Sequence, residues 1–364
     1  MPKTQPLRVI QWATGNIGKR SLQRVIEHPD MELVGLWVHS PDKSGMDAGT
    51  LCGLPPTGVI ATNSIEQILA TPADCVLYMQ QGTDIGEICA LLASGKNVVT
   101  TRGDFHHPRS MDADIRAQVE AACLAGSTSI YSTGSSPGFV TEALAIPLVS
   151  MSRRLDCLTI DEFADMTSRN SPELLFSVMG YGVSPGAFDQ RKVDHVKHDF
   201  AASLAQVADA FGIEIDAWEA FGELSAATKD TQIAAGLIPA GTVAAQRITI
   251  EGKKGGKPRL RFRANWYCTR DIDRPDWELR ESGWRIRVEG DTPMEVNITF
   301  PVSPEDYPNV TPGFTAHRAV NAVPALCAAA TGIRTTVDMA QIMDARECDL
   351  AIRRSRQATS RQDP

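Results

Sequence analysis

Short apolar runs alternate with segments of helical periodicity over the first 150 residues of the chain. The apolar runs are continuous, as in the strands of a parallel sheet that is covered on both faces. The pattern predicts strands at residues 7–12, 32–38, 74–78, 97–101 and 127–132. It predicts helices between them at residues 17–27, 84–93 and 112–125. This order indicates an α/β domain with a doubly wound parallel sheet.

The pattern changes after Met151. Strands with period-two alternation follow one another with little helix between them, which predicts an α+β domain with a mixed or antiparallel sheet. The expected strands are residues 155–164, 246–251, 260–269, 284–289 and 295–300, with a Gly/Lys turn at residues 252–258 and a helix at residues 199–211. We therefore expect a nucleotide domain over residues 1–150 and a substrate and dimerisation domain over residues 151–314. Helices within residues 315–350 are expected to fold back onto the first domain, ahead of a frayed tail at residues 353–364.

Composition excludes several functions. The chain has 36 Lys and Arg against 44 Asp and Glu, and this net charge of −8 argues against a nucleic-acid partner. The longest apolar stretches are too short or too interrupted to cross a membrane, and the N-terminus lacks the features of a secretory signal. The eight cysteines are scattered and form no CxxC motif, so we expect a reducing, cytoplasmic location without a metal site.

A glycine-rich loop follows the first predicted strand. It contains Gly15 and Gly18, with Ala13 at the position of the first glycine of a G-x-G-x-x-G motif. Gly15 lets the backbone approach a diphosphate, and Gly18 lets the following helix pack closely on the strand. This placement predicts a Rossmann domain that binds a dinucleotide. The expected contacts of the loop are Thr14, Gly15, Asn16 and Ile17.

The end of the second strand bears on the choice of coenzyme. NAD-binding sites usually place an acid there to hold the ribose hydroxyls, whereas this chain has His39 and Ser40, with Lys43 nearby. Ser40 and Lys43 suit a 2′-phosphate, which favours NADP(H) and leaves NAD(H) possible, since Asp42 is also close. The alternative is that these residues are ordinary solvated loop residues.

Further small polar residues follow other strands of the first domain, at the edge where a dinucleotide binds. They suit the nicotinamide ribose and carboxamide, although turn chemistry also explains them. The residues expected to contact the coenzyme there are Met79, Gln80, Thr100, Thr101, Gly134, Ser135 and Pro137.

Three other kinds of catalysis are poorly supported. Ser136 lies in a G-x-S-x-G sequence, but the next residue, Pro137, has no N–H to lend to an oxyanion hole. Tyr131 is followed by Ser135 where a short-chain dehydrogenase has lysine. The histidines lack a metal-binding frame, so surface or core roles are expected for them.

One carboxylate stands out as a candidate catalytic group. Asp104 lies just past the predicted strand at residues 97–101, in a loop that also contains Arg102. A carboxylate there could stabilise a cationic iminium group or accept a proton from an ammonium group. The alternative is an acid of a turn, or an ion-pair partner of Arg102.

Four sequence blocks together resemble one protein family: VIQWATGNIG at residues 9–18, TGSSPGF at 133–139, IDEFAD at 160–165 and TAHRAVNAVP at 315–324. The chain resembles the 2,4-diaminopentanoate dehydrogenases and the related native amine dehydrogenases, whose N-terminal domain is of the dihydrodipicolinate reductase type. The resemblance implies an NAD(P)-dependent oxidoreductase that reductively aminates small ketones or aldehydes, with a dimerising second domain. It also implies that Asn321 lies near the coenzyme. The family's catalytic Glu belongs to a Cys-Glu-Glu-Leu-like loop, where this chain has Gly103 and the shorter Asp104.

We therefore expect an amine dehydrogenase acting on C–N and C=N bonds, with a small carbonyl or amine substrate, ammonia as co-substrate and Asp104 as the catalytic residue. The alternatives are an NADPH-dependent carbonyl or imine reductase that does not use ammonia, and a non-catalytic NADPH-binding protein. A homodimer is expected. The residues expected to line the substrate pocket are Phe139, Phe163, Met166, Phe176, Met179, His195 and Trp266.

Overall fold

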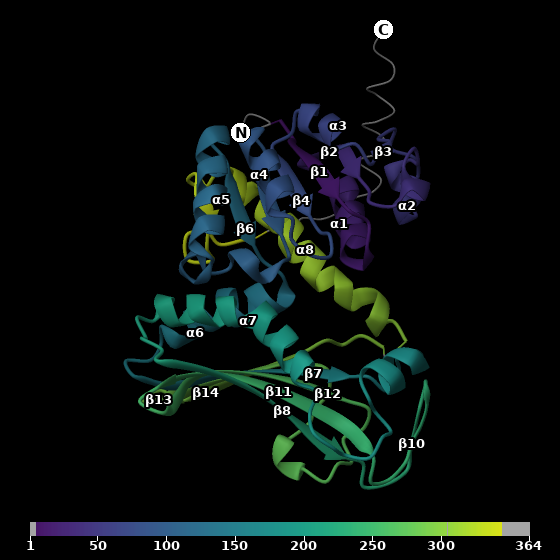
Figure 1. Ribbon diagram of the computed structural model, residues 1–364, viewed down its shortest axis with the longest axis vertical. Helices are drawn as coiled ribbons and strands as arrows, with labels where there is room; N and C mark the ends of the chain where they lie inside the picture. Colours follow the sequence, from purple (N-terminus) through teal and green to yellow (C-terminus); the bar gives the residue numbers. More distant parts are fainter. Residues whose placement is uncertain (1–4, 304, 344–364) are drawn as a thin grey trace. The chain divides into compact units, whose positions relative to one another are not determined.

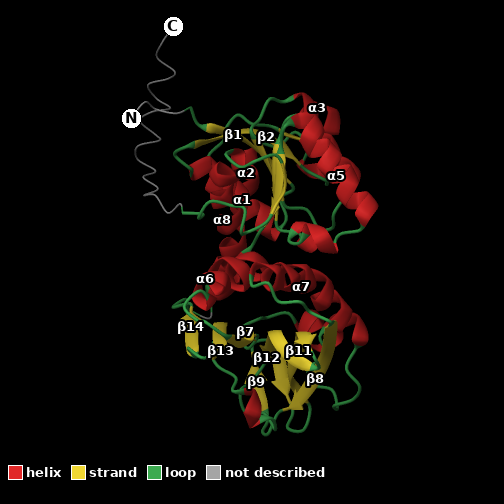
Figure 2. Ribbon diagram, turned by 90° about the vertical axis from the view of Figure 1, so that its left-hand side faces the viewer, coloured by secondary structure: helices red, strands yellow, loops and turns green. Residues whose placement is uncertain are grey.

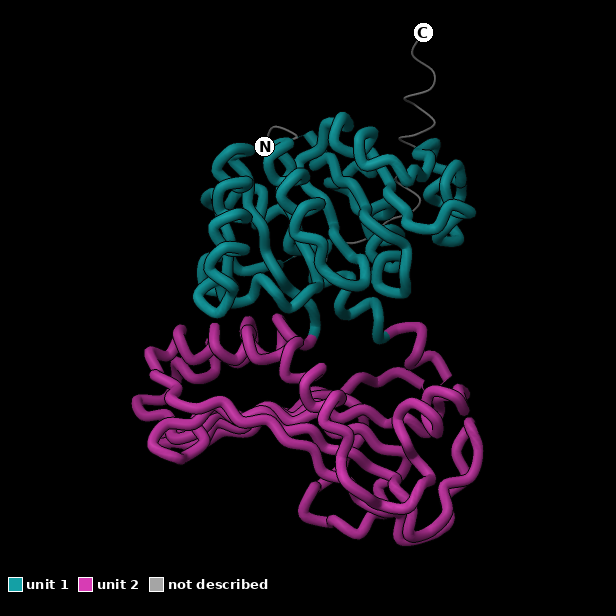
Figure 3. The backbone as a smooth tube through the Cα atoms, in the orientation of Figure 1, with its two compact units in different colours: residues 1–135, 311–364 teal, residues 136–310 magenta. Residues whose placement is uncertain are grey.

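The computed structural model describes residues 5–303 and 305–343. These residues form two compact units (Figure 3). Unit 1 comprises residues 5–135 and 311–343, and unit 2 comprises the described part of residues 136–310. The chain therefore leaves unit 1 after Ser135 and returns to it at Thr311. The predicted tail at residues 353–364, and the end of the predicted C-terminal helices, lie outside the described residues.

Unit 1 is built on a sheet of seven strands that pair in parallel. The order across the sheet is β15-β6-β5-β4-β1-β2-β3. Strand β1 therefore lies between β2 and β4, and the order of the strands reverses there, which is where open α/β sheets bind ligands. The strands are β1 (Leu7–Trp12), β2 (Met31–Trp37), β3 (Ala61–Thr62), β4 (Cys75–Tyr78), β5 (Asn97–Thr100), β6 (Ser129–Ser132) and β15 (Gly332–Arg334).

Helices cover both faces of this sheet (Figure 2). Consecutive residues of a strand point to opposite faces. Ile10 accordingly packs in a cluster with residues of α3 (Ile65–Ala70), α4 (Ile85–Ala93) and α5 (Ala113–Gly126). Val9 packs with residues of α1 (Asn16–Glu27) and α8 (Tyr307–Cys327). The short helix α2 (Ala48–Cys52) packs beside β2 and β3. The prediction of a doubly wound parallel sheet is confirmed.

Unit 2 is built on a six-stranded sheet with the order β14-β13-β7-β12-β11-β8. Strands β7 and β12 pair in parallel and the other neighbours are antiparallel, so the sheet is mixed. A small hairpin of β9 (Thr231–Ile233) and β10 (Gly236–Ile238) lies outside this sheet. The six strands are β7 (Leu155–Asp165), β8 (Ala217–Ala226), β11 (Val243–Lys254), β12 (Lys257–Tyr267), β13 (Gly283–Gly290) and β14 (Met294–Thr299).

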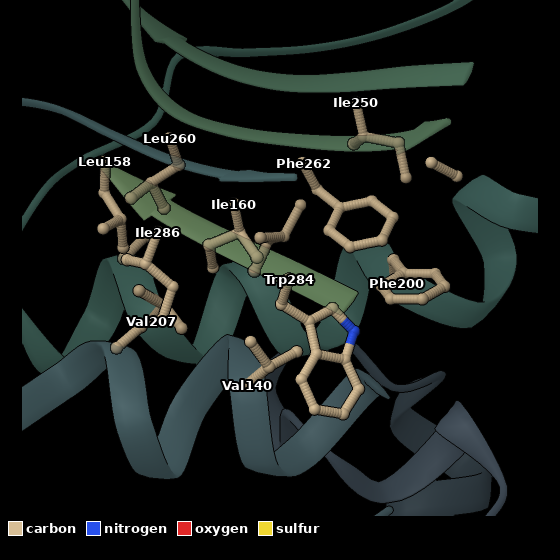
Figure 4. Close-up of a cluster of buried hydrophobic side chains, with 14 of the residues drawn as sticks. Val140, Leu158, Ile160, Phe200, Val207, Ile250, Leu260, Phe262, Trp284 and Ile286 are labelled. Atoms are coloured by element: carbon tan, nitrogen blue, oxygen red, sulfur yellow. The ribbon is translucent and has the colours of Figure 1, made fainter. Parts of the chain in front are cut away.

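One face of the six-stranded sheet carries the main apolar core of unit 2. Figure 1 shows α6 (Ala145–Val149) and α7 (Gln190–Ala210) along that face. Figure 4 shows Ile160 of β7 and Phe262 of β12 in the core, and the Phe262 ring stacks on Phe200 of α7 with 4.0 Å between ring centroids. Because side chains alternate along a strand, the neighbours of Ile160 on β7 point to the opposite face. That face carries paired charges, with Asp161 at its centre.

The structure differs from the predicted elements mainly in unit 2. Helix α7 begins at Gln190 rather than at residue 199, because Asp189 caps its start. The prediction began too late because the first turns are mostly charged and bury only Val193 and Val196. Strand β8 was not predicted. The predicted turn over residues 252–258 is tighter, since Gly255 and Gly256 alone connect β11 to β12, both with positive φ. Helix α8 begins at Tyr307 and contains Pro312, whereas the sequence predicts its start at residue 315.

Candidate active site

The loop after β1 has the geometry of a phosphate-binding loop. Ala13 has a φ of +70°, in the left-handed region that usually favours glycine. Helix α1 begins directly after Gly15, and no atom lies within 4 Å of where a Cβ on Gly15 would be. A Cβ on Gly18 would lie 2.3 Å from the carbonyl oxygen of Ala13, so only glycine allows this approach of helix and loop. Gly15 and Asn16 are exposed, so the first N–H groups of α1 are available to bind an anion there.

Two buried polar side chains brace this loop. The Gln11 amide nitrogen donates hydrogen bonds to the carbonyl oxygens of Trp12 (3.2 Å) and Ala13 (3.0 Å). The Ser21 hydroxyl of α1 donates to the Gln11 side-chain oxygen at 2.7 Å. We did not predict Gln11 or Ser21 from the sequence. The available signal was an amide inside an otherwise apolar strand, because a buried amide must find partners.

The loop after β2 contacts the loop after β1. The Lys43 ammonium group donates a hydrogen bond to the Thr14 hydroxyl at 3.2 Å. Lys43 is partly buried, whereas Asp42 and His39 are exposed. Ser40 precedes the short helical turn Pro41–Lys43. The structure thus brings Lys43, the candidate 2′-phosphate ligand, to the glycine loop.

The residues predicted to contact the coenzyme after β4 and β5 differ in whether their side chains could reach a ligand. The Met79 side chain is buried in the apolar cluster of unit 1, so only its backbone could meet a ligand. The Gln80 side chain accepts a hydrogen bond from the Trp12 indole at 3.1 Å and donates to Tyr78. The Thr100 hydroxyl accepts from the backbone N–H of Arg102 at 3.2 Å, and the adjacent Thr101 is partly buried.

Buried polar atoms without partners gather after β6 and on α8. Within the described residues, the hydroxyl groups of Ser132 and Thr133 and the Asn321 side-chain oxygen are buried and make no hydrogen bond. A buried polar group without a partner is costly, so these atoms suit a polar ligand. The ribose hydroxyls and carboxamide of a nicotinamide coenzyme would supply the missing donors and acceptors. Sequence reasoning named Asn321 and the neighbouring Gly134 but did not select Ser132 or Thr133 as contacts.

The remaining predicted contacts of this segment lie on both sides of the boundary between the units. The Ser135 hydroxyl bonds to the hydroxyl of Thr315 on α8, with 2.7 Å between the oxygens, and both belong to unit 1. Pro137 belongs to unit 2 and is partly buried.

Asp104 lies in a single helical turn, Gly103–Phe105, just after β5. Its carboxylate accepts a hydrogen bond of 2.5 Å from the Thr83 hydroxyl, and the side chain is partly buried. Thr83 precedes α4, so two loops at the carboxyl edge of the sheet hold this acid. The geometry suits a positioned carboxylate.

The seven residues expected to line one substrate pocket do not form one group. Phe163, Met166, Phe176 and Met179 belong to one apolar cluster of unit 2, whereas Phe139 and Trp266 pack against another. The physical reason is the alternation along β7, which turns Phe163 away from the face of Ile160. His195 is 75 % exposed on α7 and lies 3.7 Å from the carboxylate of Asp199.

Two cavities lie within unit 2. One, of about 600 Å³, is bordered by Phe163 and Trp284. The second, of about 450 Å³, is bordered by Asp165 and Tyr307. Both also touch Arg270 and Glu281, so they open beside one another at the end of β7.

A carboxylate that we did not predict as a site residue lies at the same end of β7. Glu162 follows Leu158 and Ile160 on the apolar face of the strand, and its carboxylate accepts a hydrogen bond from the Trp284 indole at 3.3 Å. Burial raises its pKa, and the Ser136 and Trp284 side chains oppose that rise only in part. The signal in the sequence was an acid at a position where the alternation requires an apolar residue.

Two further features bear on the class of protein. Within residues 5–303 and 305–343, no group of three or more His, Cys, Asp or Glu side chains is arranged to hold a metal ion. His106 and His107 are buried, and the His107 ring bonds to the hydroxyl of Ser110.

Among the helices of the described chain, none combines the length and apolar character needed to span a membrane.

Two family profiles match the chain. The C-terminal domain of 2,4-diaminopentanoate dehydrogenase matches residues 139–352, and the N-terminus of dihydrodipicolinate reductase matches residues 9–112. An amine dehydrogenase of Streptomyces virginiae is 27 % identical over 309 residues, which cover 80 % of this chain and 84 % of that protein. A 4-hydroxy-tetrahydrodipicolinate reductase of Mastigocladus laminosus is 36 % identical over 112 residues, which cover 30 % of this chain and 34 % of the reductase.

A solved structure shares the fold. The amine dehydrogenase from Mycobacterium smegmatis superposes with a TM-score of 0.71 at 16 % identity, covering 93 % of this chain and 97 % of that one. The profile of the C-terminal domain spans more than half of the sequence, and the glycine loop lies within the N-terminal match. The chain therefore belongs to the 2,4-diaminopentanoate dehydrogenase family, and it is an NAD(P)-dependent oxidoreductase with a Rossmann domain.

Proposed function

We propose that this protein is an amine dehydrogenase that interconverts small ketones or aldehydes, together with ammonia, and the corresponding amines. The observation that carries the proposal is the similarity to the Streptomyces virginiae amine dehydrogenase, which extends through both units. The loop geometry of unit 1 supports the coenzyme half of the reaction. Small carbonyl compounds, amines and ammonia are the proposed substrates.

The residues of unit 1 would hold the coenzyme along the carboxyl edge of its sheet. The backbone of Gly15, Asn16 and Ile17 would bind the diphosphate at the start of α1, where partial positive charge gathers. The buried hydroxyl groups of Ser132 and Thr133 would bond the ribose and carboxamide. When bound, the reduced nicotinamide supplies a hydride to the carbon of a C=N bond.

We propose that NADP(H) is preferred over NAD(H). Lys43 reaches the glycine loop through its hydrogen bond to Thr14, and a lysine there can bind a 2′-phosphate. Ser40 and His39 are the neighbouring groups that could contact the same phosphate. No acid stands directly at the end of β2 to hold two ribose hydroxyls.

Asp104 is proposed to stabilise the positive charge of the iminium group. Its hydrogen bond from Thr83 fixes the carboxylate, and a fixed charge stabilises a developing cation better than a mobile one. Asp104→Asn would remove the charge and keep the shape. We expect kcat to fall at least tenfold with little change in coenzyme binding.

The direct experiment follows NADPH oxidation with cyclohexanone or a short aliphatic aldehyde, with and without ammonium. An amine dehydrogenase consumes NADPH only when ammonium is present, and the amine appears in equal amount. Consumption without ammonium would instead show a carbonyl reductase. Tight NADPH binding without any turnover would show a non-catalytic binding protein, for which the replacement of the family's Glu by Gly103 and Asp104 is the supporting observation.

We also propose that the protein is a cytoplasmic homodimer that associates through the charged face of the six-stranded sheet. That face is lined by paired side chains such as Arg261 with Glu251 and Arg263 with Asp161. Sedimentation velocity checks the state of association, and Arg287→Glu on the same face should shift a dimer towards monomer. A monomer at micromolar concentration would contradict this proposal.

A further inference from the structure

The position of Glu162 in its strand is unusual. Along β7, Leu158 and Ile160 point into the apolar core of unit 2, and the alternation places Glu162 on the same face. The residues opposite it in the sheet are Ala264 of β12 and Trp284 of β13. A carboxylate is costly in such surroundings unless it is paired or protonated, so a purely structural reason for an acid here is weak.

The immediate neighbours of Glu162 are mostly uncharged. Trp284 donates its indole N–H to the carboxylate, and the Trp284 ring packs edge-on against Phe300 with 4.8 Å between centroids. The Ser136 side chain also lies near this carboxylate and lowers its pKa, which opposes the effect of burial. The titratable group that faces Glu162 from α8 is the phenol of Tyr307. No arginine or lysine is among the groups that shift the pKa of Glu162.

These surroundings prepare Glu162 for proton exchange. Burial raises its pKa, which favours the protonated form that a general acid needs. The raised pKa of the Tyr307 phenol, caused first by burial, keeps that neighbour neutral. The Glu162 side chain is nevertheless only partly buried, so a ligand can reach it. The buried Glu142 differs, because the Ser203 hydroxyl already donates a 2.5 Å hydrogen bond to it.

We propose that Glu162 is a catalytic acid and base of unit 2, and that it binds the nitrogen-bearing centre of the substrate. This inference rests on the proposed function. Ammonia first adds to the carbonyl carbon and gives a carbinolamine. The protonated Glu162 carboxyl then gives its proton to the hydroxyl group as the C–O bond breaks. The products are water, an iminium cation and the Glu162 carboxylate, so atoms and charge balance.

The same group serves the reverse direction. The Glu162 carboxylate accepts a proton from water as that water attacks the iminium carbon, which restores the neutral carboxyl and the carbinolamine. Between these steps the carboxylate is the counter-ion of the iminium cation.

The test compares Glu162→Gln with Glu120→Gln. Glu120 is an exposed acid on α5, so the control removes the same charge at the surface. We expect Glu162→Gln to lower kcat for ammonium-dependent NADPH oxidation by about 10²- to 10⁴-fold, while NADPH affinity stays unchanged. Glu162→Asp should recover part of the rate with a displaced pH optimum. The control should keep the rate and pH profile of the wild type.

The outcomes separate the two proposals. A wild-type protein without ammonium-dependent turnover contradicts the proposed function. An active wild type with an equally active Glu162→Gln variant contradicts the role of Glu162 alone. Should Glu162→Gln fail to fold, Glu162→Asp decides, because an undiminished rate in that variant also overturns the inference.

A second readout does not use turnover. In full-length protein labelled with ¹³C at the glutamate carboxyl groups and saturated with NADPH, the Glu162 signal is identified by its loss in Glu162→Gln. Cyclohexylammonium forms a complex with NADPH that cannot react, and its charge should lower the pKa of that carboxyl. Cyclohexanol, which has no charge, should leave the pKa unchanged. An unshifted signal with saturating cyclohexylammonium contradicts binding at Glu162.

Discussion

Arg285 of β13 and Asp161 of β7 lie opposite each other in the sheet of unit 2, and both side chains are almost completely buried. The Arg285 Nε atom donates a hydrogen bond of 2.8 Å to Asp161 Oδ2. On the other side of β7, the Arg263 guanidinium group donates to the same carboxylate at 2.9 Å. One carboxylate thus bonds to two arginines across three adjacent strands, and Glu278 supplies a second counter-charge for Arg285 at 2.7 Å.

Removing this acid should destabilise unit 2 strongly. Asp161→Asn removes the buried carboxylate from Arg263 and Arg285, and Arg285 keeps only its ion pair with the exposed Glu278. We therefore expect the free energy of unfolding to fall by about 3–5 kcal/mol. Urea unfolding followed by tryptophan fluorescence measures the change. The matched control is Asp156→Asn on the same strand, whose exposed ion pair with Arg154 should be worth less than about 1 kcal/mol. Equal effects in the two variants would contradict the importance of burial.

The ionised Asp161 also predicts that the free energy of unfolding decreases at acidic pH. Burial by itself would raise the pKa of Asp161, but the guanidinium groups of Arg263 and Arg285 outweigh burial and lower it. The folded state therefore holds the ionised form more strongly than the unfolded state does. The resulting stabilisation is complete above about pH 4, near the ordinary pKa of an aspartate, and is lost as the pH falls through the lowered pKa. Between pH 5 and pH 2, Asp161→Asn should lose less stability than the wild type, and parallel curves would refute this.

The two glycines of the loop after β1 should respond differently to alanine. Gly15→Ala meets no atom within 4 Å, and Gly15 has an ordinary φ of −67°, so the fold should tolerate it. The added methyl group would occupy the space of the diphosphate, and we expect NADPH affinity to fall at least tenfold. Gly18→Ala collides with the carbonyl of Ala13 and should lower the melting temperature as well as NADPH affinity. Thermal unfolding and fluorescence titration distinguish these results, and a stable Gly18→Ala variant with normal binding would contradict the loop geometry.

Lys43 should set the coenzyme preference. Lys43→Ala removes the cation at the Thr14 hydroxyl, and we expect kcat/KM with NADPH to fall about tenfold or more while kcat/KM with NADH changes little. The ratio of the two values is the measurement. Lys19→Ala is a suitable control, because Lys19 is an exposed lysine of the nearby helix α1. A wild-type preference for NADH would refute the proposal for NADP(H).

The sequence predicted unit 1 well because its signals are local. Strands such as β1 and β4 consist mainly of apolar residues. Gly15 precedes α1 and Gly18 lies in its first turn, where the role of each depends only on neighbours in the chain. Lys43 could be selected as a candidate for a similar reason, since it lies in the loop that follows the second strand. Buried braces such as Gln11 were missed, because their partners lie on another element.

Unit 2 was predicted less completely because its features depend on distant pairing. Strand β8 is an edge strand whose partner β11 follows it only after the β9–β10 hairpin. Phe163 and Trp266 were placed in one pocket from their residue types, yet the alternation within β7 and β12 puts them in different clusters. In the sequence, Glu162 belongs to the IDEFAD block that carries the family resemblance, and its isolation among apolar neighbours becomes visible only when β12 and β13 are in place.

The discontinuity of unit 1 has a consequence for the synthesis of the chain. Val320, Val323 and Leu326 of α8 pack in one cluster with Val9 of β1 and Val99 of β5, which are made long before α8. The edge strand β15, which pairs with β6, is later still. On the ribosome the nascent nucleotide-binding unit therefore keeps an apolar face open until Leu326 has emerged, and a fragment ended at Ser135 would never close it.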